Sequence, residues 1–282
     1  MAAPDAWRGW YELRMSELAC LDGVIAPVEE TVIPVTDDGL LRGDGAFEVV
    51  RVYDGTPLLL GEHLDRMEIS VANLRLEGSF HRDRCAAEAA ELLEARGGRS
   101  FDGCLRLVLT RGGRRLLLTE QLPSSPEVAR LASVTYAPTR VLDGIKSLSY
   151  AANMLCSRIA RERGFDEALL VTPHGRVLEA PTSSFFWVDG DGTLCTPPLD
   201  DHLLASITRA HLIALLDVEQ RSIGLDDLRA SASEAFLAST TREVQPVAAI
   251  DDFELPATPG EVSRAAAEAF AAHRDDLLRA AG

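Results

Sequence analysis

Lysine is almost absent from this chain of 282 residues, and other features are missing as well. No apolar run approaches the roughly 20 residues that a membrane-spanning helix needs, and residues 1–14 lack the hydrophobic core of a secretory signal. We therefore expect no membrane role. The five cysteines are odd in number, scattered, and form no C-x-x-C pair, a pattern that favours a reduced, cytoplasmic compartment.

The motifs of several functional classes are missing too. The sequence has no glycine-rich phosphate loop, no pair of histidines at metal-binding spacing and no Gly-x-Ser-x-Gly. We therefore predict no metal site and no simple serine hydrolase. Acidic residues outnumber basic ones by 44 to 28, for a net charge of −16. This charge repels nucleic-acid phosphates, so no nucleic-acid partner is expected.

Of the 28 basic residues, 27 are arginine, and the single lysine is Lys146. Arginine cannot lose its proton near neutral pH and attack a carbonyl, whereas a desolvated lysine can do so and form a Schiff base. Lys146 is therefore a candidate catalytic residue. The alternative is that a strong arginine bias left one lysine by chance. Which of the two interpretations holds depends on the residues around Lys146.

Periodicity predicts an α+β chain with two halves. We divide it into a small N-terminal domain, 1–136, with an extension at 1–20; a linker, 137–140; and a C-terminal domain, 141–282. The predicted helices are 61–74, 82–95, 151–164, 207–216 and 261–279, and in the third of these Ala151, Leu155 and Ile159 share an apolar face. The predicted strands are 46–53, 104–110, 116–119, 130–136, 168–172, 177–179, 184–188, 235–239 and 244–250, with a hairpin in 21–35 and a second at Asp54-Gly55.

Two hydroxyl-rich turns could hold an anion. Residues 206–209 (SITR) stand where a helix begins, and 239–241 (STT) follow a strand. Unpaired backbone N–H groups at a helix start, together with hydroxyls, suit a phosphate. The competing interpretations are an ordinary N-cap and a polar strand end. Glu179 ends a short strand, and facing a pyridine nitrogen it would keep that nitrogen protonated, although most such glutamates are simply solvated. Arg66 lies off the apolar stripe of its helix, where a surface arginine is the alternative.

At these residues the chain resembles the fold-type IV pyridoxal-phosphate enzymes, which include branched-chain and D-amino-acid aminotransferases and aminodeoxychorismate lyase. The matching pieces occur in the expected order, with the only lysine in the lysine position. They are RGDGAFE at 42–48, HLDR at 63–66, KSLSY at 146–150, DEA at 166–168, EAPTSSFF at 179–186, TPP at 196–198, SITR at 206–209 and STTREVQPV at 239–247.

The resemblance implies pyridoxal 5′-phosphate as cofactor and a larger C-terminal domain built around a barrel-like sheet. It implies that Lys146 holds the cofactor and later shuttles a proton, and that Glu179 pairs with the pyridine nitrogen. The implied phosphate cup and ring contacts are Arg66, Ile207, Thr208, Thr240, Thr241 and Leu204. The implied reaction is ping-pong transfer of an amino group between an α-amino acid and a 2-oxo acid. Relatives build their site at a dimer interface, so a homodimer is expected.

Several positions depart from the family pattern. Ser184 and Ser149 stand where asparagine is usual, and Ser206 where glycine is common. Phe47 replaces a tyrosine of the D-amino-acid transaminases, which argues against D-specificity. Glu48 replaces a threonine that the lyases use for elimination, which argues against aminodeoxychorismate lyase.

The substrate residues are less sharply marked. Alternation places Phe47, Val49 and Arg51 on one strand face, and Arg106, or Arg114 and Arg115, could grip a carboxylate, although each could be a surface charge. We favour an aminotransferase for an aliphatic amino acid. The alternatives within the fold are aminodeoxychorismate lyase and a D-amino-acid or (R)-amine transaminase. A non-catalytic binding protein has no need of Lys146 and Glu179, and a cofactor-free Schiff-base aldolase has no need of two anion turns.

Overall fold

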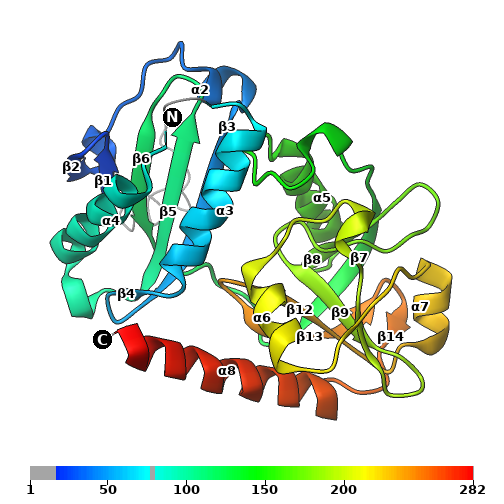
Figure 1. Ribbon diagram of the computed structural model, residues 1–282. Helices are drawn as coiled ribbons and strands as arrows, with labels where there is room; N and C mark the ends of the chain where they lie inside the picture. The colour runs from blue at the N-terminus through cyan, green and yellow to red at the C-terminus, as the bar shows by residue number, and fades with distance from the viewer. Residues whose placement is uncertain (1–16, 77–79, 282) are drawn as a thin grey trace, which may run out of the picture. The chain divides into compact units, whose positions relative to one another are not determined.

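The computed structural model describes residues 17–76 and 80–281, which form two compact units. Of the described residues, the first unit comprises 17–76, 80–123, Ile145–Ser149 and Ala281. Its described strands form a six-stranded antiparallel sheet in the order β2-β1-β6-β5-β3-β4 (Figure 1). These strands are β1 (Leu18–Leu21), β2 (Val24–Pro27), β3 (Gly45–Tyr53), β4 (Thr56–Pro57), β5 (Gly103–Thr110) and β6 (Arg115–Glu120). Its helices are α2 (Asp38–Arg42), α3 (Leu60–Asn73) and α4 (Arg82–Arg96), with short 3₁₀ turns at Val28–Glu30 and Gly98–Ser100.

The two faces of this sheet differ. Helices α3 and α4 cover one face, which we call the helix face (Figure 1). Their buried apolar side chains and those of the sheet form the hydrophobic core of this unit. Leu64 and Met67 of α3 are buried against β3, as the helical spacing predicts. The opposite face carries Phe47 and Val49 of β3, beside Arg106 and Val108 of β5, and we call it the open face, because several of its side chains are only half-buried.

A short segment extends the first sheet beyond β3. Residues 145–149 run antiparallel to it, with Ala46 opposite Ser147. The Phe47 N–H donates to the Lys146 carbonyl at 3.0 Å, and the Leu148 N–H donates to the Gly45 carbonyl at 2.9 Å. This pairing fixes the backbone on both sides of Lys146.

The second unit comprises Ser124–Gly144 and Tyr150–Ala280. Its described strands form an eight-stranded mixed, barrel-like sheet, in the order β11-β10-β9-β12-β13-β7-β8 with β14 beside β13. They are β7 (Ala129–Thr135), β8 (Glu167–Val171), β9 (Ser184–Val188), β10 (Leu194–Thr196), β11 (Glu219–Gln220), β12 (Glu234–Ser239), β13 (Glu243–Ile250) and β14 (Phe253–Glu254). The helices are α5 (Ala151–Glu162), α6 (Ile207–Leu215), α7 (Leu225–Ser231) and α8 (Glu261–Ala281), with 3₁₀ turns at Arg140–Leu142 and Leu199–Asp201.

Most predicted elements are confirmed within two or three residues, and a few predictions are wrong. The segment 177–179 is no strand: Val177 makes an isolated bridge to Val171, and its N–H donates to the Ile223 carbonyl. Helix α5 buries Cys156, Ser157 and Ala160, whereas Leu155 of the predicted apolar face is 50% exposed.

The predicted N-terminal extension lies mostly outside the described residues, and its last residues, 18–20, belong to β1. β7, expected in the first domain, pairs with β8 and β13 of the second sheet. The domain bounds 1–136 and 141–282 stay a prediction.

Candidate functional site

Lys146 lies in the first unit, beside β3 and α3. Its backbone N–H donates to the Ser70 hydroxyl of α3 at 3.1 Å. Its register opposite Phe47 directs both side chains to the open face, and the Lys146 Nζ lies 4.5 Å from the centroid of the Phe47 ring. The only primary amine of any side chain is thus half-buried and held against an aromatic face.

Arg106 of β5 contacts the same ring. Its guanidinium carbon lies 5.6 Å from the Phe47 centroid. Its Nε donates to both oxygens of Glu120, at 3.0 and 2.9 Å. Of the predicted substrate residues, the structure therefore brings Phe47 and Arg106 together with Lys146.

The two arginines of the β5–β6 turn lie elsewhere in this unit. The Arg114 side chain is partly exposed and donates to Asp22 at 2.9 Å. Arg115 is the first residue of β6, and its buried guanidinium is bound by both oxygens of Glu88. Arg115 therefore has a structural role in the core, because its guanidinium already donates to both carboxylate oxygens of Glu88.

Arg66 forms a buried cluster with two residues that the sequence analysis did not select as a site. The Arg66 Nε donates to Glu48 Oε1 and its second terminal nitrogen to Oε2, both at 2.7 Å. The His63 Nδ1 lies 2.8 Å from Glu48 Oε2, and since an ionised carboxylate only accepts, that nitrogen carries the proton. Glu48 and His63 are almost completely buried on the helix face.

The protonation states of this cluster follow from its contacts. Burial opposes the ionised form of Glu48, but hydrogen bonds from Arg66 and His63, together with the positive charge of Arg66, outweigh it and lower the pKa of Glu48 to about 2. Burial lowers the pKa of His63, and the positive charges of Arg66 and Lys146 add to this effect against the opposing pull of Glu48. The cluster is therefore an ionic pair of Glu48 and Arg66 with a neutral histidine.

Glu179 lies in the second unit, in a turn before β9. Its Oε1 accepts from the Leu204 N–H at 3.4 Å. Arg209 of α6 is buried, which lowers its pKa, and the charge of Glu179 counters that effect. Burial raises the pKa of Tyr136, and the negative charge of Glu179 raises it further. Glu179, Leu204 and Arg209 therefore form one electrostatic neighbourhood.

Helix α6 begins at Ile207 with Ser206 as its N-cap. The Ser206 hydroxyl accepts from the Arg209 N–H at 3.3 Å. The first N–H groups of a helix, here those of Ile207 and Thr208, have no acceptor within their own helix. They make this helix start suitable for an anion.

Thr240 and Thr241 form the tip of the β12–β13 hairpin. The strands pair up to Ser239 opposite Glu243, and the Arg242 N–H donates to the Ser239 hydroxyl at 3.3 Å. Both threonines are half-buried, and β12 also packs against α6.

Buried hydroxyls test whether this part of the second unit fits a polar ligand. Ser183 and Ser184 lie just after the Glu179 turn and are almost fully buried, yet neither hydroxyl has a hydrogen-bond partner among the described residues. Buried hydroxyls are nearly always paired. Two orphaned hydroxyls in the segment that follows Glu179 therefore fit a polar group such as a phosphorylated pyridine.

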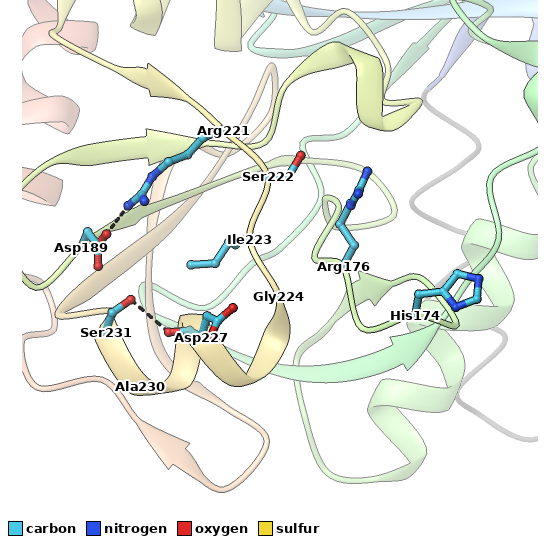
Figure 2. A pocket seen from close by; sticks show the side chains of 10 residues that line it. All are labelled: His174, Arg176, Asp189, Arg221, Ser222, Ile223, Gly224, Asp227, Ala230 and Ser231. Atoms are coloured by element: carbon cyan, nitrogen blue, oxygen red, sulfur yellow. Dashed lines mark hydrogen bonds and ion pairs between the residues drawn. The ribbon is translucent and has the colours of Figure 1, made fainter.

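A separate cavity of about 600 Å³ lies beside α7 (Figure 2). It contains none of the predicted site residues. Its arginines are already paired with protein carboxylates: Arg221 with Asp189 (Figure 2), and Arg176 with Asp201 at 2.6 Å.

Residues 17–76 and 80–281 offer neither a metal site nor a membrane-spanning helix. No group of three or more histidine, cysteine or acidic side chains there could hold a metal ion. No helix in those ranges has the length and apolar character to cross a membrane.

Comparison with known proteins identifies relatives over most of the chain. A putative branched-chain-amino-acid aminotransferase of Methanocaldococcus jannaschii is 32% identical over 254 residues, covering 82% of this chain and 87% of the relative. A D-alanine aminotransferase of Bacillus licheniformis is 31% identical, with 82% and 87% covered. An aminodeoxychorismate lyase of Bacillus subtilis is 26% identical, with 84% and 88% covered.

Solved structures give the same result for the fold. The branched-chain aminotransferase of Thermoproteus uzoniensis with norvaline superposes with a TM-score of 0.80 at 26% identity, covering 91% of this chain and 94% of the other. A hypothetical aminotransferase from Mycobacterium tuberculosis in its PLP-bound form superposes with a TM-score of 0.79 at 25% identity, covering 91% and 98%.

The family model for amino-transferase class IV matches residues 45–250, more than half of the chain. This match confirms the resemblance drawn from the motifs, the α+β fold of the fold-type IV enzymes, and an enzyme with pyridoxal phosphate as its cofactor. The chain belongs to the class IV aminotransferase family.

Proposed function

We propose that this enzyme moves an amino group between an aliphatic α-amino acid and a 2-oxo acid by a ping-pong mechanism. The observation that carries the proposal is the position of Lys146, the only lysine, with its Nζ 4.5 Å from the centroid of the Phe47 ring. The aliphatic preference is supported by the half-buried apolar side chains Val49, Val108 and Leu118 on the same open face.

The proposed roles follow the chemistry of each side chain. Bound pyridoxal phosphate supplies the electron sink that makes the α-proton of an amino acid removable. The Lys146 amine would hold the cofactor covalently, and when free its Nζ would take up and return the α-proton of the substrate. Glu179 would keep the pyridine nitrogen protonated, and Leu204 would supply an apolar contact to the ring.

The phosphate would be held by donors from several elements. The N–H groups of Ile207 and Thr208 and the hydroxyls of Thr240 and Thr241 suit a dianion. Arg66 adds a positive charge whose orientation Glu48 fixes through two hydrogen bonds. Phe47 and Arg106, and more distantly Arg114, are the proposed substrate residues.

Glu48 favours a transaminase over aminodeoxychorismate lyase. The lyases carry a threonine at this position, whereas Glu48 is fully buried and binds His63 and Arg66. No hydroxyl for an elimination step is offered there. Release of pyruvate from aminodeoxychorismate without a 2-oxo acid acceptor would favour the lyase and defeat our first choice.

The test of the function is a screen of amino donors and 2-oxo acid acceptors with the purified holoenzyme. Both enantiomers of each donor and a set of (R)-amines are included, because the D-amino-acid and (R)-amine reactions are alternatives on this fold. We expect turnover with branched or linear aliphatic amino acids. Lys146→Ala should stay folded and lose turnover, whereas an unfolded variant would indicate a structural lysine.

We also propose that the enzyme is a cytoplasmic homodimer with its site near the subunit interface. The cytoplasmic location is supported by the five cysteines, all of which are free and buried. The dimer is supported by exposed large apolar side chains close together in sequence, namely Val32, Val35, Leu40 and Leu41.

A further inference from the structure

A row of four side chains crosses the open face of the first sheet beside the Lys146 amine. Lys146 lies opposite Phe47, and on the other side of β3, Val49 lies opposite Arg106 of β5. Glu120 of β6 is opposite Cys104, one step along the same face. Side chains opposite each other in an antiparallel pair share a face, so Lys146, Phe47, Arg106 and Glu120 lie together.

The charge of Arg106 is already compensated within this row. Its Nε contacts both Glu120 oxygens, and a terminal nitrogen lies 2.9 Å from Glu120 Oε2. The two side chains are 33% and 28% exposed, so the pair lies where a ligand on this face can reach it. The Phe47 ring separates the pair from Lys146, and it contacts both cations.

We propose that Glu120 determines substrate specificity, by occupying the guanidinium that would otherwise bind a second substrate carboxylate. An unpaired arginine near the reacting amine could bind a carboxylate through two parallel hydrogen bonds. Paired with Glu120 it presents no net charge, and an incoming side-chain carboxylate would face the like charge of Glu120. The site therefore selects amino and 2-oxo acids with uncharged side chains. This inference rests on the proposed function, since it names the substrate class of the same site.

The test compares two unreactive ligands by isothermal titration calorimetry of the holoenzyme. Glutarate has two carboxylates, whereas 4-methylpentanoate has one carboxylate and an apolar tail. Glu120→Gln keeps the size of the side chain and removes its charge. We expect it to tighten glutarate about tenfold relative to 4-methylpentanoate, and to shift the kcat/KM ratio of 2-oxoglutarate to 4-methyl-2-oxopentanoate in the same direction.

Three further variants separate this effect from a change in net charge or folding. Glu254→Gln removes the same group from the exposed pair with Arg130 and should leave the ratio unchanged. Arg106→Gln combined with Glu120→Gln should abolish the gain, because the guanidinium is gone. Glu120→Asp keeps the charge but shortens its reach, and should give a smaller shift in the same direction.

The outcomes are distinct. An unchanged ligand ratio in Glu120→Gln, or equal tightening of both ligands, would overturn the assignment, because Arg106 would then bind nothing or bind the carboxylate common to both. A wild-type enzyme that binds both ligands yet transfers no amino group would defeat the proposed function, while the ligand ratio would still decide the role of Glu120.

Discussion

Glu48 is a charged residue inside an apolar strand. Hydrogen bonds from Arg66 and His63 to its two carboxylate oxygens offset the cost of burying its charge. Alternation along β3 places it on the same side as Ala46 and Val50, which are fully buried. This pattern could have identified Glu48 from the sequence, because a carboxylate on a buried face needs a partner. The identity of that partner could not be predicted, since it depends on how α3 packs on the sheet.

We expect the Glu48–Arg66 pair to contribute strongly to the free energy of unfolding of the first unit. Glu48→Gln keeps the shape but leaves Arg66 without its anion where little water reaches, so we expect a loss of about 3 kcal/mol in the free energy of unfolding. Urea denaturation of the apoprotein measures it. Glu254→Gln, at an exposed pair with Arg130, should leave the midpoint in place. Equal midpoints for the two variants would contradict the buried-pair account.

The same cluster predicts a loss of stability in acid. Glu48 has a pKa of about 2 in the folded state against an ordinary 4.5, so its contribution is complete above pH 4.5 and is lost as the pH falls toward 2. His63 has a pKa below its ordinary 6.5, so the unfolded chain takes up a proton first and stability falls as the pH drops below 6.5. Denaturation curves from pH 7.5 down to about pH 2 should show both losses, that of His63 first and that of Glu48 below pH 4.5. In His63→Gln the decline between pH 6.5 and 5 should be shallower, and an unchanged slope would argue against a buried neutral histidine.

Among the helices and strands, the sequence predicts the long periodic elements and misses the short ones. The spacing of Leu64 and Met67 predicts α3, and Asp54-Gly55 predicts the β3–β4 turn, where both residues have positive φ. Short elements such as α2, α7 and β10 carry too few residues for a periodic signal. The apolar face predicted for α5 was wrong because Leu155 turns outward, and tertiary contacts of Cys156 and Ala160 decide the buried side.

The start of α6 predicts an effect on both stability and cofactor affinity. Ser206→Ala removes the N-cap bond to the Arg209 N–H and should cost about 1 kcal/mol in the free energy of unfolding. The apoprotein should also bind pyridoxal phosphate more weakly, because the Ile207 and Thr208 amides lose their fixed direction. Urea denaturation and cofactor titration measure the two effects. Ser206→Asn retains a capping oxygen and should behave like the wild type; if Ser206→Ala does so too, the N-cap has no such role.

For the whole molecule, long-range pairing limits what the sequence predicts. Lys146 falls in the predicted C-terminal domain, yet its segment pairs with β3, about a hundred residues earlier. The hydrophobic periodicity within a segment cannot predict which distant strand that segment pairs with. The motif order predicted the family correctly, whereas the contacts of Lys146 with Phe47 and Ser70 required the structure.

The proposed dimer can be tested by size-exclusion chromatography with light scattering. The wild type should have twice the 30.5 kDa mass of one chain. Leu40→Asp combined with Leu41→Asp should shift it toward the monomer, because both side chains are 58% exposed in the isolated chain. Unchanged circular dichroism serves as the folding control. A wild-type monomer would exclude the dimer, and a variant that stays dimeric would place the interface elsewhere.

The most direct measurement is borohydride reduction of the holoenzyme followed by peptide mass spectrometry. Because the chain has one lysine, a pyridoxyl group can attach to a single side-chain amine. Our account predicts that the added mass lies on the peptide that contains Lys146. A protein without the adduct, or with the adduct only at its amino terminus, would contradict the role of Lys146 and with it the proposed catalysis.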